Sequence, residues 1–162
     1  MHKSIIILFL FAISIHNIEE AIWLSRRSLK TNKIRIHKSI QHDDFLFGLF
    51  VVTSLAYLVT ILYIFYPSNF IFKYTYFGFL SSMIINIIFP HLISTIVERC
   101  YSPGLLTGIS VIIPTNILII GNGFTSNTIT LINFIIGTLV VNVILFLLIP
   151  LSFKLGKKII TF

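Results

Sequence analysis

The stretch FLFGLFVVTSLAYLVTILYIFY, residues 45–66, decides the fold class. It runs without a charged side chain and ends at Pro67. A helix needs about 20 mostly apolar residues to cross a bilayer, at about 1.5 Å per residue. Its apolar residues are continuous, whereas the strands of a membrane barrel are short and alternate between apolar and polar. This stretch therefore predicts a transmembrane helix.

Four more stretches of the same kind flank it. The chain of 162 residues is 56% hydrophobic and 10% charged, with a mean hydropathy of +1.00. Soluble domains carry roughly 25% charged residues, so polar side chains are too few here to cover a core in water. We predict an all-α fold, a polytopic membrane helix bundle of about five transmembrane helices that forms a single integral membrane domain over residues 1–162. The predicted spans are residues 4–24, 45–66, 74–97, 104–120 and 129–153.

The basic residues predict the orientation of the bundle. With five spans, ten of the twelve Lys and Arg residues fall on one side, six of them in the segment 25–44. Because basic loops stay in the cytoplasm, we expect a multi-pass protein of the cell (plasma) membrane with its N-terminus outside and its C-terminus cytoplasmic. The net charge of +7 then serves topology and contact with anionic membrane lipids, and no nucleic-acid partner is expected. A cleaved signal peptide is the alternative for the first span, disfavoured by the length of the run and by the lack of a small-x-small cleavage site.

Ionisable residues stand inside the first span, in the sequence His16-Asn17-Ile18-Glu19-Glu20. An ionised side chain at the centre of a membrane helix costs about 2.5–3.5 kcal/mol even on the mildest scale, so such residues mark functional sites by default. Glu19 and Glu20 follow His16 by three and four residues and share one broad helix face with it. Zinc-binding helices use the same spacing to bring two ligands to one metal. The alternative is that both carboxylates simply reach the headgroups.

The third span carries a second polar stripe, and it lies at the same depth. His91, Thr95 and Glu98 are spaced along one face, Asn86 precedes them, and Pro90 should kink the helix and open room beside His91. His16 and His91 would both lie about 9–12 Å from the cytoplasmic ends of their spans. Ionisable groups from two helices at one level predict a shared intramembrane site. The alternative for a lone histidine is helix packing.

The connection to the fourth span completes the pattern with Tyr101-Ser102-Pro103-Gly104 and then Thr107. We expect a structural turn at residues 102–104, because Pro-Gly suits a tight turn and Ser102 can cap a helix. Thr107 could face the site. These three motifs together resemble the HXXEE family of bacterial membrane proteins over nearly the whole chain. The resemblance implies a multi-span membrane protein whose His and Glu residues are suspected of an enzymatic role.

The favoured hypothesis is a membrane-embedded, hydrolase-like metalloenzyme with its site near the cytoplasmic leaflet. His16, Glu20 and His91 would bind a divalent metal, with zinc as the first candidate, and Glu19 or Glu20 would act as the catalytic carboxylate. The substrate would be a lipid or a membrane-bound peptide. A transporter or proton/cation-binding membrane protein and a non-catalytic accessory membrane protein are the alternatives, and the oligomeric state stays open. Residues expected around the ligands are Asn17, Asn86, Thr95, Glu98, Tyr101 and Thr107.

Overall fold

The computed structural model of the chain describes residues 3–27 and 42–160, which form helices and short turns with no strand among them. This confirms the predicted all-α fold. The elements are α1 (Lys3–Arg27), α2 (His42–Phe65), α3 (Phe70–Asn86), the π-helical segment η2 (Ile87–Leu92), α4 (Ile93–Glu98), α5 (Leu105–Thr107), the π-helical segment η3 (Gly108–Ile112), α6 (Ile113–Thr125) and α7 (Leu131–Ile160).

Five helical stretches are long and apolar enough to cross a membrane. They cover Ser4–Trp23, His42–Phe65, Phe70–Glu98, Leu105–Thr125 and Leu131–Ile159. Each of the five ranges expected from the sequence falls on one of these stretches. The expected orientation depends most on four basic residues that lie outside the described residues, namely Lys30, Lys33, Arg35 and Lys38.

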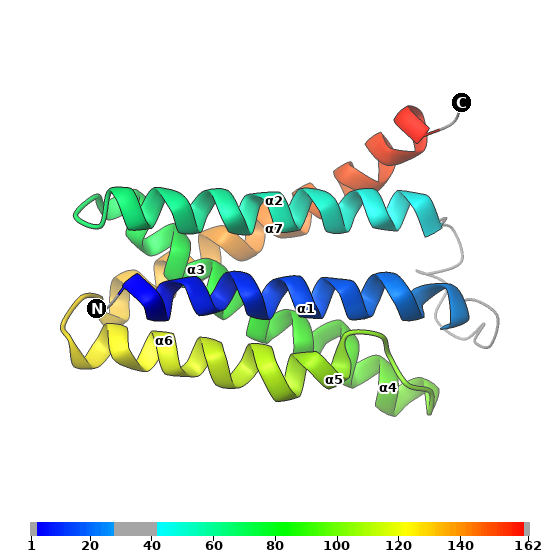
Figure 1. Cartoon of the computed structure of the whole chain (residues 1–162), viewed down its shortest axis with the longest axis horizontal. Coiled ribbons are helices and arrows are strands. Elements are labelled where there is room, and N and C mark those ends of the chain that lie inside the picture. The colour runs from blue at the N-terminus through cyan, green and yellow to red at the C-terminus, as the bar shows by residue number, and fades with distance from the viewer. Residues whose placement is uncertain (1–2, 28–41, 161–162) are drawn as a thin grey trace.

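Consecutive long helices run in alternating directions, so the two termini lie at opposite ends of the bundle (Figure 1). Helix α1 packs against α2 on one side and against α5, η3 and α6 on the other. Helix α3 packs on α2, α6 and α7, and α7 also covers α2. The centre of the bundle is filled by aromatic rings of α1, α2 and α3, among them Phe9, Tyr63 and Tyr76, which are at most 2% exposed.

The third long stretch is broken next to Pro90. Proline lacks an N–H and disfavours helical geometry in the preceding residue, and Phe89 indeed leaves the helical region at φ −132° and ψ 115°. The chain resumes as a helix and continues through α4 to Glu98. The kink expected at Pro90 is therefore confirmed, and it falls directly before His91.

Candidate metal centre

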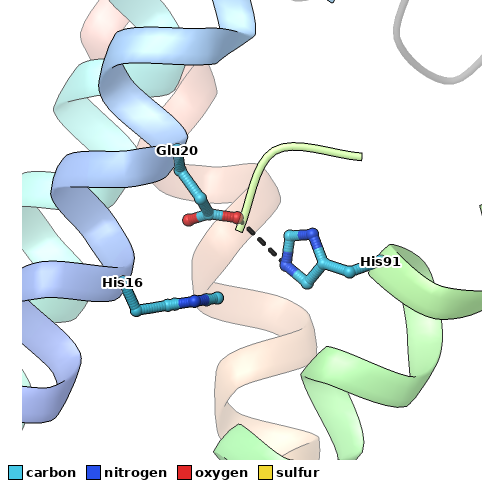
Figure 2. Close-up of side chains that lie close together, drawn as sticks. All are labelled: His16, Glu20 and His91. Atoms are coloured by element: carbon cyan, nitrogen blue, oxygen red, sulfur yellow. Dashed lines mark ion pairs between the residues drawn. The ribbon is translucent and has the colours of Figure 1, made fainter. Parts of the chain in front are cut away.

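Three ionisable side chains from two distant parts of the chain meet inside the bundle. His16 and Glu20 lie one turn apart on α1, and His91 reaches them from the broken segment η2 (Figure 2). One ligand atom from each of the three lies within 4.8 Å of the others. The three residues are between 2% and 6% exposed. This is the set that the sequence predicts as metal ligands.

The contacts within the set are close. Glu20 Oε1 lies 3.0 Å from His91 Nε2, and the two imidazole rings stand edge to face with centroids 5.4 Å apart. Imidazole nitrogen and carboxylate oxygen bind zinc at about 2.0–2.2 Å, and a His₂Glu set with an open fourth position is a known catalytic arrangement. The geometry could hold a divalent ion after a small inward movement of the three side chains.

His91 is held by groups on both sides of the kink. Asn86 Nδ2 lies 3.3 Å from its Nε2, and the hydroxyl of Ser102 lies 3.4 Å from its Nδ1. Thr95 donates to the His91 carbonyl oxygen at 2.8 Å and accepts the backbone N–H of Ser102 at 3.0 Å. Asn86 and Thr95 thus adjoin His91 as expected. Ser102, predicted only as part of a turn, is a site residue that the sequence reasoning missed.

Glu19 has a different environment from Glu20. Its carboxylate accepts hydrogen bonds from the Tyr101 hydroxyl, the Gly104 N–H at 3.1 Å, the Thr107 N–H at 2.8 Å and the Thr107 hydroxyl at 2.6 Å. The two N–H groups are among those that the start of a helix leaves without an intrahelical partner. Glu19, on α1, therefore caps the start of the fourth long helical stretch, Leu105–Thr125, hereafter the fourth long helix. A carboxylate held by four donors is not a free base, so the catalytic role expected for Glu19 stays a prediction that this geometry does not favour.

Tyr101 also contacts the capped turn. Besides its bond to Glu19 it accepts the backbone N–H of Leu106 at 3.2 Å. Partial burial, together with the hydrogen bond to Glu19, raises the pKa of Tyr101 to about 12. The phenol therefore remains a proton donor to Glu19 at every physiological pH.

Gly104 is the second residue that sequence reasoning missed. Its φ of +87° lies in the left-handed region that favours glycine. A Cβ at this position would lie 2.9 Å from both Glu20 Cγ and His16 Cε1. Only the absence of a side chain at residue 104 lets the turn lie directly against His16 and Glu20. The Pro-Gly pair indicated a turn, but nothing in the sequence indicated what the turn contacts.

Two residues expected around the ligands do not join them. The Asn17 amide donates to Thr53 Oγ1 of α2 at 2.6 Å, so it ties α1 to α2 instead. Glu98 does not belong to the group of potential ligands that the described residues form. Successive helix positions differ by about 100°, which turns Asn17 away from the direction shared by His16 and Glu20.

A cavity of about 350 Å³ opens beside the capped turn. It is lined by Ile15, Ile18, Glu19, Trp23, Tyr101, Leu106 and Thr107. Its lining is mostly apolar and includes exposed side chains of α1 and α5, whereas Glu19, Tyr101 and Thr107 contribute polar groups. The hydroxyl of Thr107 is also 3.2 Å from His16 Nδ1, so one side chain separates the cavity from a candidate ligand.

Comparisons with known proteins agree with the motifs. The family described as "Protein of unknown function with HXXEE motif" matches residues 7–119, which include every residue of the cluster and of the capped turn. The chain is 48% identical over 151 residues to the "Uncharacterized protein YrkK" of Bacillus subtilis (strain 168), covering 93% of this chain and 94% of that protein. No solved structure matches the chain. The chain therefore belongs to the family of proteins of unknown function with an HXXEE motif.

Proposed function

We propose that this protein is a membrane-embedded, metal-dependent enzyme of hydrolase type, whose His16, Glu20 and His91 bind one divalent metal ion. The observation that carries the proposal is the convergence of these three side chains, all nearly inaccessible to solvent, from α1 and η2. Zinc is the first candidate because two imidazoles and one carboxylate suit it. Such an ion would act as a Lewis acid at the site.

Energetics favour a metal site over a packing device. An ionised group at the centre of a membrane helix costs about 2.5–3.5 kcal/mol, whereas interhelical polar contacts return on average about 0.6 kcal/mol. A cluster kept only to hold helices together would therefore lose more than it gains. A divalent cation offsets the carboxylate charge and uses the imidazole lone pairs, which is why we place this reading above the transporter and accessory-protein alternatives.

The substrate in this proposal is a lipid or a membrane-bound peptide that approaches from the bilayer. The cavity next to the site supports this, because exposed apolar side chains such as Ile18, Trp23 and Leu106 line it. Glu20 would hold the metal, and the hydroxyl of Thr107 would mark the boundary between the cavity and the ligands.

We also propose that the protein spans the cell membrane with its N-terminus outside. The test is cysteine labelling of a Cys100→Ser background with a single new cysteine at Ser126 or Lys158, which lie in the turn after α6 and near the end of α7. An impermeant reagent added to intact cells should label position 126 and leave position 158 unlabelled until the cells are opened. The reverse pattern would overturn the orientation, and labelling of both from outside would overturn the topology.

Metal analysis tests the site itself. Purified protein should carry about one equivalent of a divalent metal after exposure to it and removal of excess, and His16→Ala and His91→Ala should lose it while remaining helical. His42→Ala is the matched control, because His42 is exposed at the start of α2 and lies outside the cluster. A wild-type protein that retains no metal, or variants that all retain it equally, would contradict the proposal. The first of these results would favour a transporter or accessory role.

A further inference from the structure

We propose that the two glutamates of the motif have different tasks: Glu20 is a metal ligand, whereas Glu19 is a positioning residue that acts on His16 through the hydroxyl of Thr107. This inference rests on the proposed metal site and assigns roles within it. It identifies Nε2 as the metal-binding nitrogen of His16, and it adds Thr107 as a positioning residue on the fourth long helix.

The hydrogen bonds at Thr107 have a fixed direction. Its hydroxyl has a single hydrogen, which it donates to Glu19 Oε2 at 2.6 Å. Toward His16 Nδ1, 3.2 Å away, the same hydroxyl can therefore only accept. A hydrogen bond between His16 and Thr107 therefore requires the His16 proton on Nδ1, which leaves its Nε2 the lone pair that a metal needs. Ligating histidines are commonly held by such a contact at the second ring nitrogen, which fixes the tautomer and the ring orientation.

Glu19 has no free acceptor position for a metal in this arrangement. Four donors meet its two oxygens, namely the Tyr101 hydroxyl, the Gly104 N–H and both donors of Thr107. An ionised carboxylate is acceptor-only and has about four lone-pair sites, so these donors use its full capacity. Binding a metal would remove several of these bonds at once and leave the start of the fourth long helix without its cap.

The carboxylate of Glu20 has different contacts from that of Glu19. Among the described residues, the polar contact of its carboxylate is the one to His91 Nε2 at 3.0 Å. Glu20 therefore retains lone pairs for a metal and points into the cluster beside His16 (Figure 2). Adjacent glutamates differ by about 100° around the helix. One side chain of the pair thus faces the capped turn, and the other faces the ligands.

The test measures divalent metal affinity by competition with a chelator, using the full chain in detergent. Thr107→Val removes the hydroxyl at nearly constant shape and should weaken Zn²⁺ binding about 10–100-fold, the usual effect of losing a group that orients a ligand. Thr107→Ser restores the hydroxyl and should recover most of the affinity. Thr60→Val is the matched control, because Thr60 is fully buried and, within the described part of the chain, its hydroxyl bonds to its own helix at the Ala56 carbonyl oxygen.

The two glutamates are compared in the same assay. Glu20→Gln should abolish measurable Zn²⁺ binding, whereas Glu19→Gln should retain it with an affinity lowered about 10–100-fold. Equal loss in both variants, or wild-type affinity in Thr107→Val, would overturn the assignment. Co²⁺ spectra add a readout that a general loss of stability would not change, since Thr107→Val should alter the ligand field and Thr60→Val should not.

Failure of this inference can be told apart from failure of the metal proposal. If the wild-type protein binds no metal, the proposed function fails, but the tautomer can still be measured in metal-free protein by ¹⁵N NMR of labelled histidine, with His16→Ala to assign the signal. The Nδ1-protonated form of His16 should dominate and should be lost or mixed in Thr107→Val. A His16 protonated on Nε2 would refute the inference whether or not metal binds.

Discussion

Replacing Gly104 by alanine adds one methyl group at the point where the turn contacts His16 and Glu20, the proposed metal ligands. The left-handed backbone of residue 104, at φ +87°, costs an L-residue with a Cβ roughly 1–2 kcal/mol. The new Cβ would also begin 2.9 Å from Glu20 Cγ and from His16 Cε1, whereas ordinary contact starts at 3.4 Å. Both ligands, or the turn, must therefore shift by about half an ångström, and metal sites tolerate about 0.2 Å. We expect Gly104→Ala to weaken Zn²⁺ binding at least about tenfold.

The assay pairs chelator competition with thermal unfolding of the metal-free protein. Gly121→Ala is the matched control, because a Cβ on Gly121 meets nothing within 4 Å. That control should bind Zn²⁺ as the wild type does. Gly104→Ala should lose about 1–2 kcal/mol of stability from its backbone even without metal. If Gly104→Ala matches Gly121→Ala in both measurements, the turn does not press on the ligands and the reasoning about this contact is wrong.

Two further predictions concern the capped turn and the cavity. The pKa of Tyr101 is raised from 10.0 to about 12, so its hydrogen bond to Glu19 should stabilise the fold fully below pH 10 and be lost as the pH rises toward 12. The free energy of unfolding, measured against pH, should show this dependence in the wild type and not in Tyr101→Phe. Equal pH profiles for the two proteins would contradict the prediction. Trp23, the single tryptophan, lines the cavity, so a brominated fatty acid in detergent should quench its fluorescence saturably. Leu106→Gln should weaken this quenching. Leu139→Gln should not, and it is the control because Leu139, on α7, is about as exposed as Leu106. Equal quenching in the two variants would mean that hydrocarbon has no preferred site in the cavity.

The sequence was sufficient for the helices and for the convergence of His16, Glu20 and His91, because both follow from simple physical rules. Long apolar runs must be helical in lipid, and buried charges must find one another, which brought His16 and Glu20 to His91. It did not suffice for Glu19, because its partners lie on the far side of a turn whose docking on α1 no spacing encodes. The same holds for Gly104, whose Cβ-free surface matters only once the turn is in place.

The long sequence separation between Glu19 and Thr107 affects how the chain is assembled during synthesis. Glu19 and Thr107 are 88 residues apart, and a ribosome adds about 5–20 residues per second, so Glu19 is made roughly 4–18 s before Thr107. During that interval each ionised group would cost a few kcal/mol in hydrocarbon. We expect the newly synthesised first helix to remain at the translocon or in the headgroup layer. It should reach its final depth in the membrane only when residues 91–107 have been made.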